Sequence, residues 1–371
     1  MSDDDNLPEA DRAEGAPHPR ETAALYGHDA AEAEVLAAFT GDRMHHAWMI
    51  TGPKGIGKAT LAWRMAKFLL AREPADAGMF DDLPEAPASL DIDPDHPVAH
   101  RIAALSDPGC LLIRRAWDHD KKRLKTQVTV EEVRKLNAFF GLSAAEGGHR
   151  VVIVDSADEM NPSAANALLK VLEEPPKGAV LILISHQPAR LLPTIRSRCR
   201  VLRLNELDPD DMARALSGAG VETDGGAALF ELAGGSVGAA IRLEADDGLA
   251  LYAEILGVIG TAPSMDRQRL AKLIEKVAAR GAEARLDLAV TLLDLALARM
   301  ARHAAGMTPA TEACPGEAEV LARLAATPDA ARTWAALQQD LSARIAHGRG
   351  VNIDPASLMT DAFLQINEAA H

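Results

Sequence analysis

The sequence predicts an α/β fold, in which a parallel β-sheet is followed by a region made only of helices. Continuous apolar runs at residues 46–50, 151–155 and 180–185 predict buried strands. Segments with apolar residues at helical spacing separate these runs, and strands that alternate with helices are typical of a parallel sheet covered on both faces. Aromatic residues make up only 4% of the chain, which favours helices over an all-β fold.

The other elements of the α/β region follow from apolar spacing. A helix is expected at 161–174, where Pro175-Pro176 stops the pattern because proline cannot continue a helix. Residues 73–100 hold five prolines, many acidic residues and no lysine or arginine, so we expect a surface excursion there. The remaining expected elements are helices at 25–41 and 130–140, a helix after residue 58 that carries apolar residues at helical spacing from 61 to 69, and strands at 111–113 and 200–204.

The chain of 371 residues is long enough for two or three domains. An acidic tail at 1–20 is expected to be disordered. We expect the α/β domain at 21–206, a small helical unit at 207–248 and a second helical unit at 249–371.

Charge and cysteine content argue against several classes of protein. With a net charge of −15, the chain would need a local basic patch or a larger assembly to hold nucleic acid. The cysteines are far apart, which argues against a disulfide framework and a four-cysteine zinc site: Cys110, Cys199 and Cys314. No stretch reads as a signal peptide or reaches the roughly 18 apolar residues of a membrane span, so we expect a cytoplasmic protein without membrane contact.

A glycine-rich motif between the first strand and the next helix fits the phosphate-loop pattern G-x-x-x-x-G-K. Its residues are Gly52, Pro53, Lys54, Gly55, Ile56, Gly57 and Lys58. Glycines let backbone N–H groups turn toward phosphate oxygens, while the lysine and the helix N-terminus add positive potential. The position that should carry a Mg²⁺-binding hydroxyl is Ala59, and Thr60 points about 100° away along the helix. The flanking strand and helix favour a nucleotide-binding loop over a glycine-rich turn without ligand.

Two further strands end in polar residues that fit a nucleotide site. The strand at 151–155 ends in Asp155, the arrangement of a Walker B carboxylate that faces Mg²⁺ through water. A water-activating glutamate commonly follows, but this chain has Ser156, whose hydroxyl is a poor base. Ser185 ends its strand at the position of a polar sensor residue. The alternatives are a core strand with a solubilising carboxylate and an ordinary strand-end turn.

Two longer motifs resemble one family. Residues 161–176 read NPSAANALLKVLEEPP, and residues 191–199 read LLPTIRSRC. Behind a phosphate-binding loop and a Walker B strand, they resemble subunits of the bacterial replicative clamp loader of DNA polymerase III, an AAA+ assembly. The resemblance covers 25–206 well and the rest weakly. It implies an AAA+ P-loop domain, a helical lid domain at 207–248 and a C-terminal all-helical collar domain at 249–371 that joins subunits.

The chain departs from the motor subunits of this family, called gamma or tau. Ala59 and Ser156 lack the hydrolytic groups, Gly238 stands where a G-S-x-R stretch carries arginine, and the four-cysteine zinc module is missing. The resemblance therefore implies a stationary, non-hydrolysing subunit with no required cofactor and no zinc. Bound ATP or ADP at the degenerate site stays open. The alternatives are an active motor, in which Thr60 and Asp158 replace the missing groups, and a branch-migration motor, which should lack both long motifs.

Arg198 lies in the Ser-Arg-Cys part of the second motif. By resemblance it is an arginine finger that acts in trans on the γ-phosphate held by a neighbouring gamma or tau subunit; the alternative is an ion pair with a surface carboxylate. The resemblance also implies a hetero-oligomer with gamma/tau and delta subunits, which meets the sliding clamp and primed DNA through the complex. A basic run at 121–125 either contacts DNA or an acidic partner, or is a solvated hairpin tip.

Overall fold

The computed structural model describes residues 8–12, 15–22, 24–41, 44–72, 87–141 and 148–371. The chain forms two compact units, of which the first spans 1–221 and 235–238 and the second spans 222–234 and 239–371. We call them the α/β unit and the helical unit. Residues 207–248, expected to form one small helical domain, are shared between the two units.

Five parallel strands form the sheet of the α/β unit, in the order β2-β5-β6-β1-β7. Their bounds are Ala47–Thr51 for β1, Cys110–Ile113 for β2, Arg150–Val154 for β5, Ala179–Ser185 for β6 and Arg200–Arg203 for β7. β6 lies between β1 and β5, so that Leu181 is opposite both Ala47 and Val152. The carboxyl ends of these three strands therefore meet at one edge of the sheet, and the predicted parallel sheet is confirmed.

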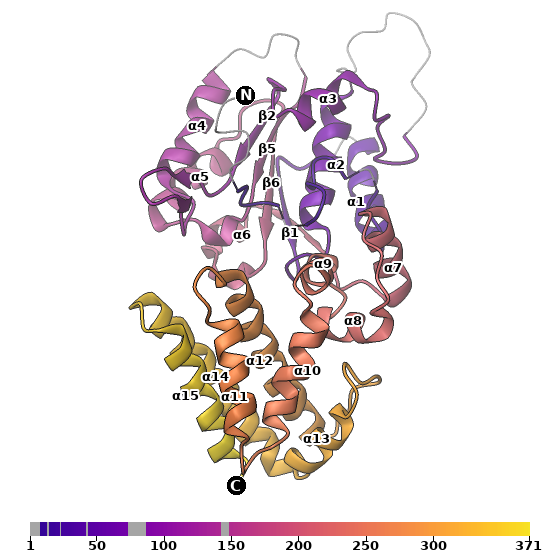
Figure 1. The fold of residues 1–371 in the computed structure, drawn as a ribbon. Coiled ribbons are helices and arrows are strands. Elements are labelled where there is room, and N and C mark those ends of the chain that lie inside the picture. The colour runs from indigo at the N-terminus through magenta and orange to yellow at the C-terminus, as the bar shows by residue number, and fades with distance from the viewer. Residues whose placement is uncertain (1–7, 13–14, 23, 42–43, 73–86, 142–147) are drawn as a thin grey trace, which may run out of the picture. The chain divides into compact units, whose positions relative to one another are not determined.

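Helices cover both faces of this sheet (Figure 1). On one side lie α1 (Asp29–Thr40) and α2 (Lys58–Leu70), and on the other side lie α4 (Val130–Gly141) and α5 (Pro162–Glu173). All five residues of β5 are buried. Because successive side chains of a strand point to opposite faces, coverage on both sides explains why the strand sequences are continuously apolar.

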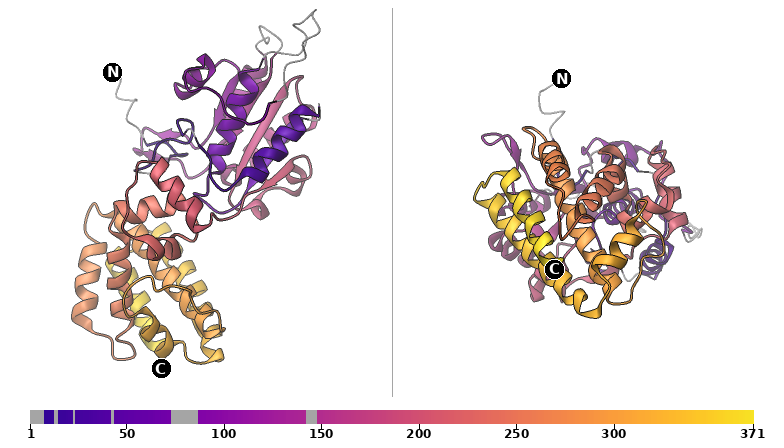
Figure 2. Two further views of the ribbon diagram at one scale, coloured as in Figure 1. Left: turned by 90° about the vertical axis from the view of Figure 1, so that its right-hand side faces the viewer. Right: turned by 60° about the horizontal axis from the view of Figure 1, so that its bottom comes forward.

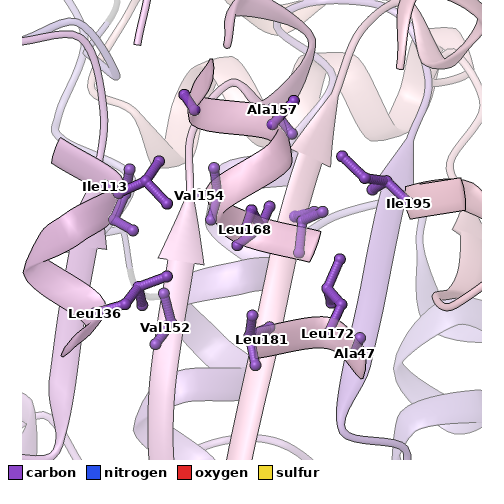
Figure 3. Close-up of a cluster of buried hydrophobic side chains, with 14 of the residues drawn as sticks. Ala47, Ile113, Leu136, Val152, Val154, Ala157, Leu168, Leu172, Leu181 and Ile195 are labelled. Carbon is purple, nitrogen blue, oxygen red and sulfur yellow. The ribbon is translucent and has the colours of Figure 1, made fainter. Parts of the chain in front are cut away.

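One hydrophobic core lies between the sheet and helices α4 and α5. Figure 3 shows Val152 and Val154 of β5 beside Leu136 of α4 and Leu168 of α5. None of these four side chains is more than 1% exposed. Truncation of such a side chain typically costs about 2–5 kcal/mol because a cavity remains. This packing holds the end of β5, and with it the position of Asp155.

Helix α5 begins and ends close to the predicted bounds. The Asn161 side chain accepts a hydrogen bond from the Ala164 N–H at 2.8 Å, and Pro162 occupies the first turn, where a missing N–H costs nothing. The helix ends at Glu173, just before Pro175-Pro176. Local sequence signals are therefore sufficient to set the limits of this element.

Two features of the region between α2 and α4 were not expected in detail. Residues 73–86 lie outside the described residues, but the predicted surface excursion ends in a helix, α3 (Pro97–Ala103). Strands β3 (Trp117–Asp118) and β4 (Arg123–Leu124) pair as an antiparallel hairpin. The basic run lies at this hairpin, and the cations at its tip are exposed.

The acidic tail, expected to be disordered, differs from that expectation in the part that the structure describes. Residues 1–7 and 13–14 lie outside that part. The side chains of Asp11 and His18 are each only 1% exposed. Asp11 forms an ion pair with Arg114, which follows β2. Composition could not reveal this, because the partner lies about a hundred residues away in the sequence.

The described residues of the helical unit form helices without strands. A long helix, α12 (Glu283–Ala304), packs along α14 (Pro328–Gly350) (Figure 2). The other helices after the sheet are α8 (Gly226–Ala233), α9 (Val237–Ala245), α10 (Gly248–Ile259), α11 (Arg267–Val277), α13 (Glu317–Leu324) and α15 (Pro355–Ala369), while α7 (Pro209–Gly218) belongs to the α/β unit. None of the helices described is both long and apolar enough to cross a membrane.

A buried ion-pair network crosses the helical unit. Arg299 of α12 donates to Glu317 at 2.7 Å and to Glu231 at 2.9 Å, and the Tyr252 hydroxyl donates to Glu317 at 2.7 Å. Arg299 is 4% exposed and Glu317 is 1% exposed. Burial by itself would raise the pKa of the Glu317 carboxyl. The hydrogen bonds from the Arg299 guanidinium and the Tyr252 hydroxyl outweigh burial and hold this pKa below its usual value. These side chains join four helices of this unit, α8, α10, α12 and α13.

Candidate nucleotide site and exposed arginine

The phosphate-binding loop lies between β1 and α2, as predicted, and depends on glycine for its shape. Gly52, Gly55 and Gly57 have φ angles of 144°, 80° and 103°, which side-chain-bearing residues rarely adopt. A Cβ atom on Gly52 would also lie 2.4 Å from the Leu204 carbonyl oxygen. The loop therefore has the conformation that turns N–H groups toward an anion at the start of a helix.

Lys58, the last residue of the motif, lies folded against its own loop. Its side chain donates to the carbonyl oxygen of Gly52 at 2.8 Å and to that of Pro53. Burial lowers the pKa of Lys58 to about 8, although the carboxylates of Asp155 and Asp158 oppose the shift. The ammonium group therefore still carries its charge at pH 7 and can pair with phosphate.

Asp155 follows β5 and lies buried close to Lys58. Burial raises the pKa of Asp155 to about 7, and the nearby carboxylates of Asp11 and Glu159 act in the same direction, whereas Ser156 and Lys58 lower it. The structure thus brings the predicted Walker B carboxylate and the loop lysine into one electrostatic cluster. At neutral pH this carboxyl group is only partly ionised, which weakens it as a Mg²⁺ partner.

Ser156 replaces the water-activating glutamate and is occupied by its neighbours. Its hydroxyl donates to Asp155 Oδ1 at 3.0 Å, so its oxygen is left to accept from His186 Nε2 at 2.9 Å. The His186 backbone N–H donates to Asp158 Oδ1 at 2.9 Å. Burial, followed by the charge of Lys58, lowers the pKa of His186 to about 4. Neither side chain is a competent base at pH 7 in this arrangement.

Sequence reasoning selected Ser185 as the sensor residue and missed His186. Ser185 is fully buried at the end of β6, and its hydroxyl has no hydrogen-bond partner among the described residues. His186, the next residue, is the one whose ring reaches Ser156. The signal available in the sequence was a histidine directly after the apolar strand. The contact of His186 with Ser156 depends on which strand lies beside β6, and the periodicity of the sequence does not reveal which strands are neighbours.

The segment 235–238 lies against the phosphate-binding loop. The Ser236 hydroxyl donates to the Lys54 carbonyl at 2.8 Å, and the Gly238 N–H donates to the Gly55 carbonyl at 3.0 Å. A Cβ atom on Gly238 would lie 3.1 Å from Gly55 Cα. Gly238 is where the motor subunits are expected to carry arginine, and this close approach leaves little room for a side chain.

Ala59 and Thr60 occupy the first turn of α2, where both are half-buried. Position 59 offers no hydroxyl for a metal ion. The site therefore combines an anion-binding loop and a lysine with neither of the two groups that hydrolysis would use, the metal-binding hydroxyl and the general base.

Arg198 follows the short helix α6 (Pro193–Arg196) and is partly exposed. Its guanidinium donates to the Thr194 carbonyl at 2.9 Å and to Glu173 Oε1 at 2.8 Å, and 34% of the side chain is exposed. In the single chain it therefore makes the ion pair that was the alternative to a finger. The pair is weak because Glu173 is half exposed. Burial raises the pKa of Cys199, next to it, to about 11, so this thiol is not a nucleophile at neutral pH.

One cluster in the described residues has the composition of a metal site, namely Glu9, Asp11 and His18. Both carboxylates already pair with arginine. The Arg20 N–H donates to His18 Nδ1 at 3.1 Å, and His18 Nε2 faces Asp11 at 3.2 Å. These polar groups are therefore engaged with one another and with the arginines, and we describe the cluster as an ion-pair cluster.

Residues 27–208 match the family described as DNA polymerase III, delta subunit. This part of the chain belongs to the DNA polymerase III delta′ family. The delta′ subunit of Pseudomonas aeruginosa is 40% identical over 42% of this chain and 41% of its own length. The delta′ subunit of Escherichia coli is 30% identical over 57% of this chain and 58% of its own length. The chain thus spans about half the length of these curated relatives.

A gamma/tau relative is less similar to this chain than the two delta′ subunits above. The DNA polymerase III gamma/tau subunit of Mycobacterium tuberculosis is 28% identical over 54% of this chain and 31% of its own length. The delta′ likeness includes the phosphate-binding loop, the Walker B strand and the Arg198 motif, all of which lie within residues 27–208.

Proposed function

We propose that this chain is a non-hydrolysing, stationary subunit of a DNA polymerase III clamp loader. In that role it would help load the sliding clamp on primed DNA, in a hetero-oligomer with gamma/tau and delta subunits. A replication role places it in the cytoplasm. The observation that carries the proposal is the state of the nucleotide site, in which Ala59 offers no metal ligand and Ser156 is bonded on both sides by Asp155 and His186.

The chemically active group in this proposal is Arg198, which acts on nucleotide held by a neighbouring gamma/tau subunit. A guanidinium supplied in trans stabilises charge that develops on the transferred phosphoryl group. The partial exposure of Arg198 and its single ion pair with Glu173 support this role, since an exposed pair exchanges its partner at little cost. Glu173 holds the side chain in place until the neighbour arrives.

An ATPase assay on the isolated chain tests the proposal that it does not hydrolyse ATP. Purified protein should not turn over ATP, with or without Mg²⁺. Hydrolysis that disappears in the Lys58→Ala variant would replace the proposal with the alternative, an active gamma/tau-type motor. The geometry disfavours that alternative, because Asp158 already accepts the His186 N–H and Thr60 lies on another side of the helix.

An ATPase assay on the reconstituted complex tests the proposed role of Arg198. Arg198→Ala should leave assembly with gamma/tau and delta intact, as measured by gel filtration. It should lower the ATPase rate at the adjacent site by about 10³–10⁵, the range for a finger supplied in trans. Arg196→Ala is the matched control, because Arg196 is an exposed cation two residues away. Equal rates for the Arg198→Ala complex and the parent complex would remove Arg198 from the mechanism.

A further inference from the structure

Strand β2 forms one edge of the sheet, and only β5 pairs with it. The Val151 N–H donates to the Gly109 carbonyl at 2.8 Å, directly before β2 begins. Further along, the Ile113 carbonyl accepts from the Asp155 N–H, also at 2.8 Å. Alternate residues of a paired strand direct their backbone groups to the same side, so the N–H and C=O groups of Leu112 point away from β5, toward the free edge of β2.

The described residues leave this free edge without a partner strand. The segment at 8–12 approaches the end of β2, where Glu9 and Asp11 pair with the Arg114 side chain. None of its described backbone groups bonds to β2, and no described backbone group outside the sheet bonds to Leu112. Unpaired N–H and C=O groups along a strand edge are a template on which an extended peptide can add a strand.

A cavity of about 1210 Å³ lies along the free edge. Three consecutive residues of β2 line it, namely Cys110, Leu111 and Leu112. Because successive side chains of a strand point to opposite faces, consecutive lining residues place the cavity beside the strand and not on one face of it. The cavity is larger than the roughly 300–1,000 Å³ of small-molecule pockets, which leaves room for a length of polypeptide.

Apolar side chains border the cavity before and after β2. Leu105, which precedes the strand, lines the cavity and is 44% exposed. Beyond the other end of the strand, Trp117 of β3 is paired with Leu124 of β4, and both residues line the cavity. An extended segment that pairs with β2 would therefore meet apolar groups at each end of its course.

The charged side chains of the lining favour an acidic occupant. Each of the three carboxylates in the lining already pairs with a cation. The pairs are Glu9–Arg20, Asp107–Arg101 and Glu132–Lys135. Arg12 donates to the Ala16 carbonyl at 3.1 Å, and neither Arg12 nor Lys54 forms an ion pair with a described residue. Cations without a carboxylate partner in a partly enclosed site attract anionic groups, because solvent screens them less than at an open surface.

We propose that the free edge of β2 is a docking site for an extended, acidic segment of a partner protein. The segment adds a strand to the sheet through the Leu112 backbone. Its apolar side chains pack on Leu105 and Trp117, and its carboxylates pair with Arg12 and Lys54. A nucleic acid would satisfy the cations but not the strand edge, whose N–H and C=O groups repeat at the spacing of a polypeptide. The inference does not depend on the role of Arg198.

The test uses the full chain and a short fluorescein-labelled peptide in which Val and Asp alternate. Fluorescence anisotropy reports binding, and we expect a Kd of about 100 µM or lower. The same peptide with every backbone nitrogen methylated cannot donate to a strand edge, and it should bind at least about tenfold more weakly. A peptide in which Val and Lys alternate should show the same loss, because its charge is opposite.

Two variants place the peptide in the cavity. Leu105→Asn removes an apolar contact at a position with a φ angle of 51°, which asparagine tolerates. Arg12→Gln/Lys54→Gln removes the two cations. Each variant should raise the Kd by about tenfold. The matched control is Leu364→Asn, which changes a leucine of the helical unit that is 51% exposed, and it should leave the Kd unchanged.

Absence of peptide binding would overturn the proposal. Equal affinity for the methylated peptide would exclude strand addition, and an unchanged Kd in both cavity variants would exclude this site. An oligothymidylate that binds where the peptide does not would identify a nucleic-acid site instead. Peptide binding that appears only after removal of residues 1–7, which include three aspartates, would make the chain's own N-terminus the occupant. None of these results would touch the proposed clamp-loader role, which is measured in the complex through Arg198.

Discussion

The raised pKa of Asp155 makes a quantitative prediction about stability. Its pKa rises from 3.8 to about 7 on folding, mainly because the group is buried. The folded chain therefore holds this proton more tightly than the unfolded chain, and stability contributed by the protonated form is lost as pH rises from about 4 to 7. At 1.36 kcal/mol per pH unit, the ionised carboxylate costs about 4 kcal/mol above pH 7.

Asp155→Asn should remove this cost. The asparagine side-chain oxygen can still accept from Ser156, so the variant should match the parent chain below pH 4. Above pH 7 the free energy of unfolding of the variant should exceed that of the parent chain by up to about 4 kcal/mol. Relaxation of the site around the ionised carboxylate would reduce this difference. Urea unfolding followed by the fluorescence of the buried Trp48 and Trp63 in the same unit measures the difference at each pH.

Asp95→Asn serves as the control for this experiment, because Asp95 is an exposed carboxylate in the same unit. Its effect on the free energy of unfolding should be small. A constant difference between Asp155→Asn and the parent chain from pH 4 to 9 would refute the reasoning, since it would mean that Asp155 ionises freely in the folded chain.

Two further variants probe other parts of the structure. Arg299→Met should destabilise the helical unit by about 3–5 kcal/mol, because it leaves the buried Glu317 without its cation; Arg299→Met/Glu317→Met should recover much of this loss in thermal unfolding. Gly238→Arg should cost about 1–3 kcal/mol through overpacking against Gly55, and it should not confer ATP hydrolysis on the isolated chain. A Gly238→Arg variant as stable as the parent chain would contradict the expected overpacking, and ATP turnover by this variant would contradict the expected lack of hydrolysis.

Much of the α/β unit was predictable because its signals are local. Residues 151–154 of β5 are continuously apolar because the strand is covered on both faces, and the limits of α5 follow from Asn161 and the two prolines. The glycine spacing of the phosphate-binding loop predicts its positive φ angles. The missing hydroxyl at Ala59 could likewise be read directly from the sequence.

The residue pattern alone is sufficient to predict the sheet, the phosphate-binding loop and the loss of the usual hydrolytic residue types. How the remaining polar groups are paired follows only from the folded arrangement of the chain. It joins Ser156 to His186, seats Arg198 on Glu173 and brings Asp11 to Arg114. Each of these pairs joins residues at least about 25 positions apart, so no local periodicity can encode it. The pKa of Asp155 depends on such contacts in the same way, because burial and neighbouring charge arise only when distant segments meet.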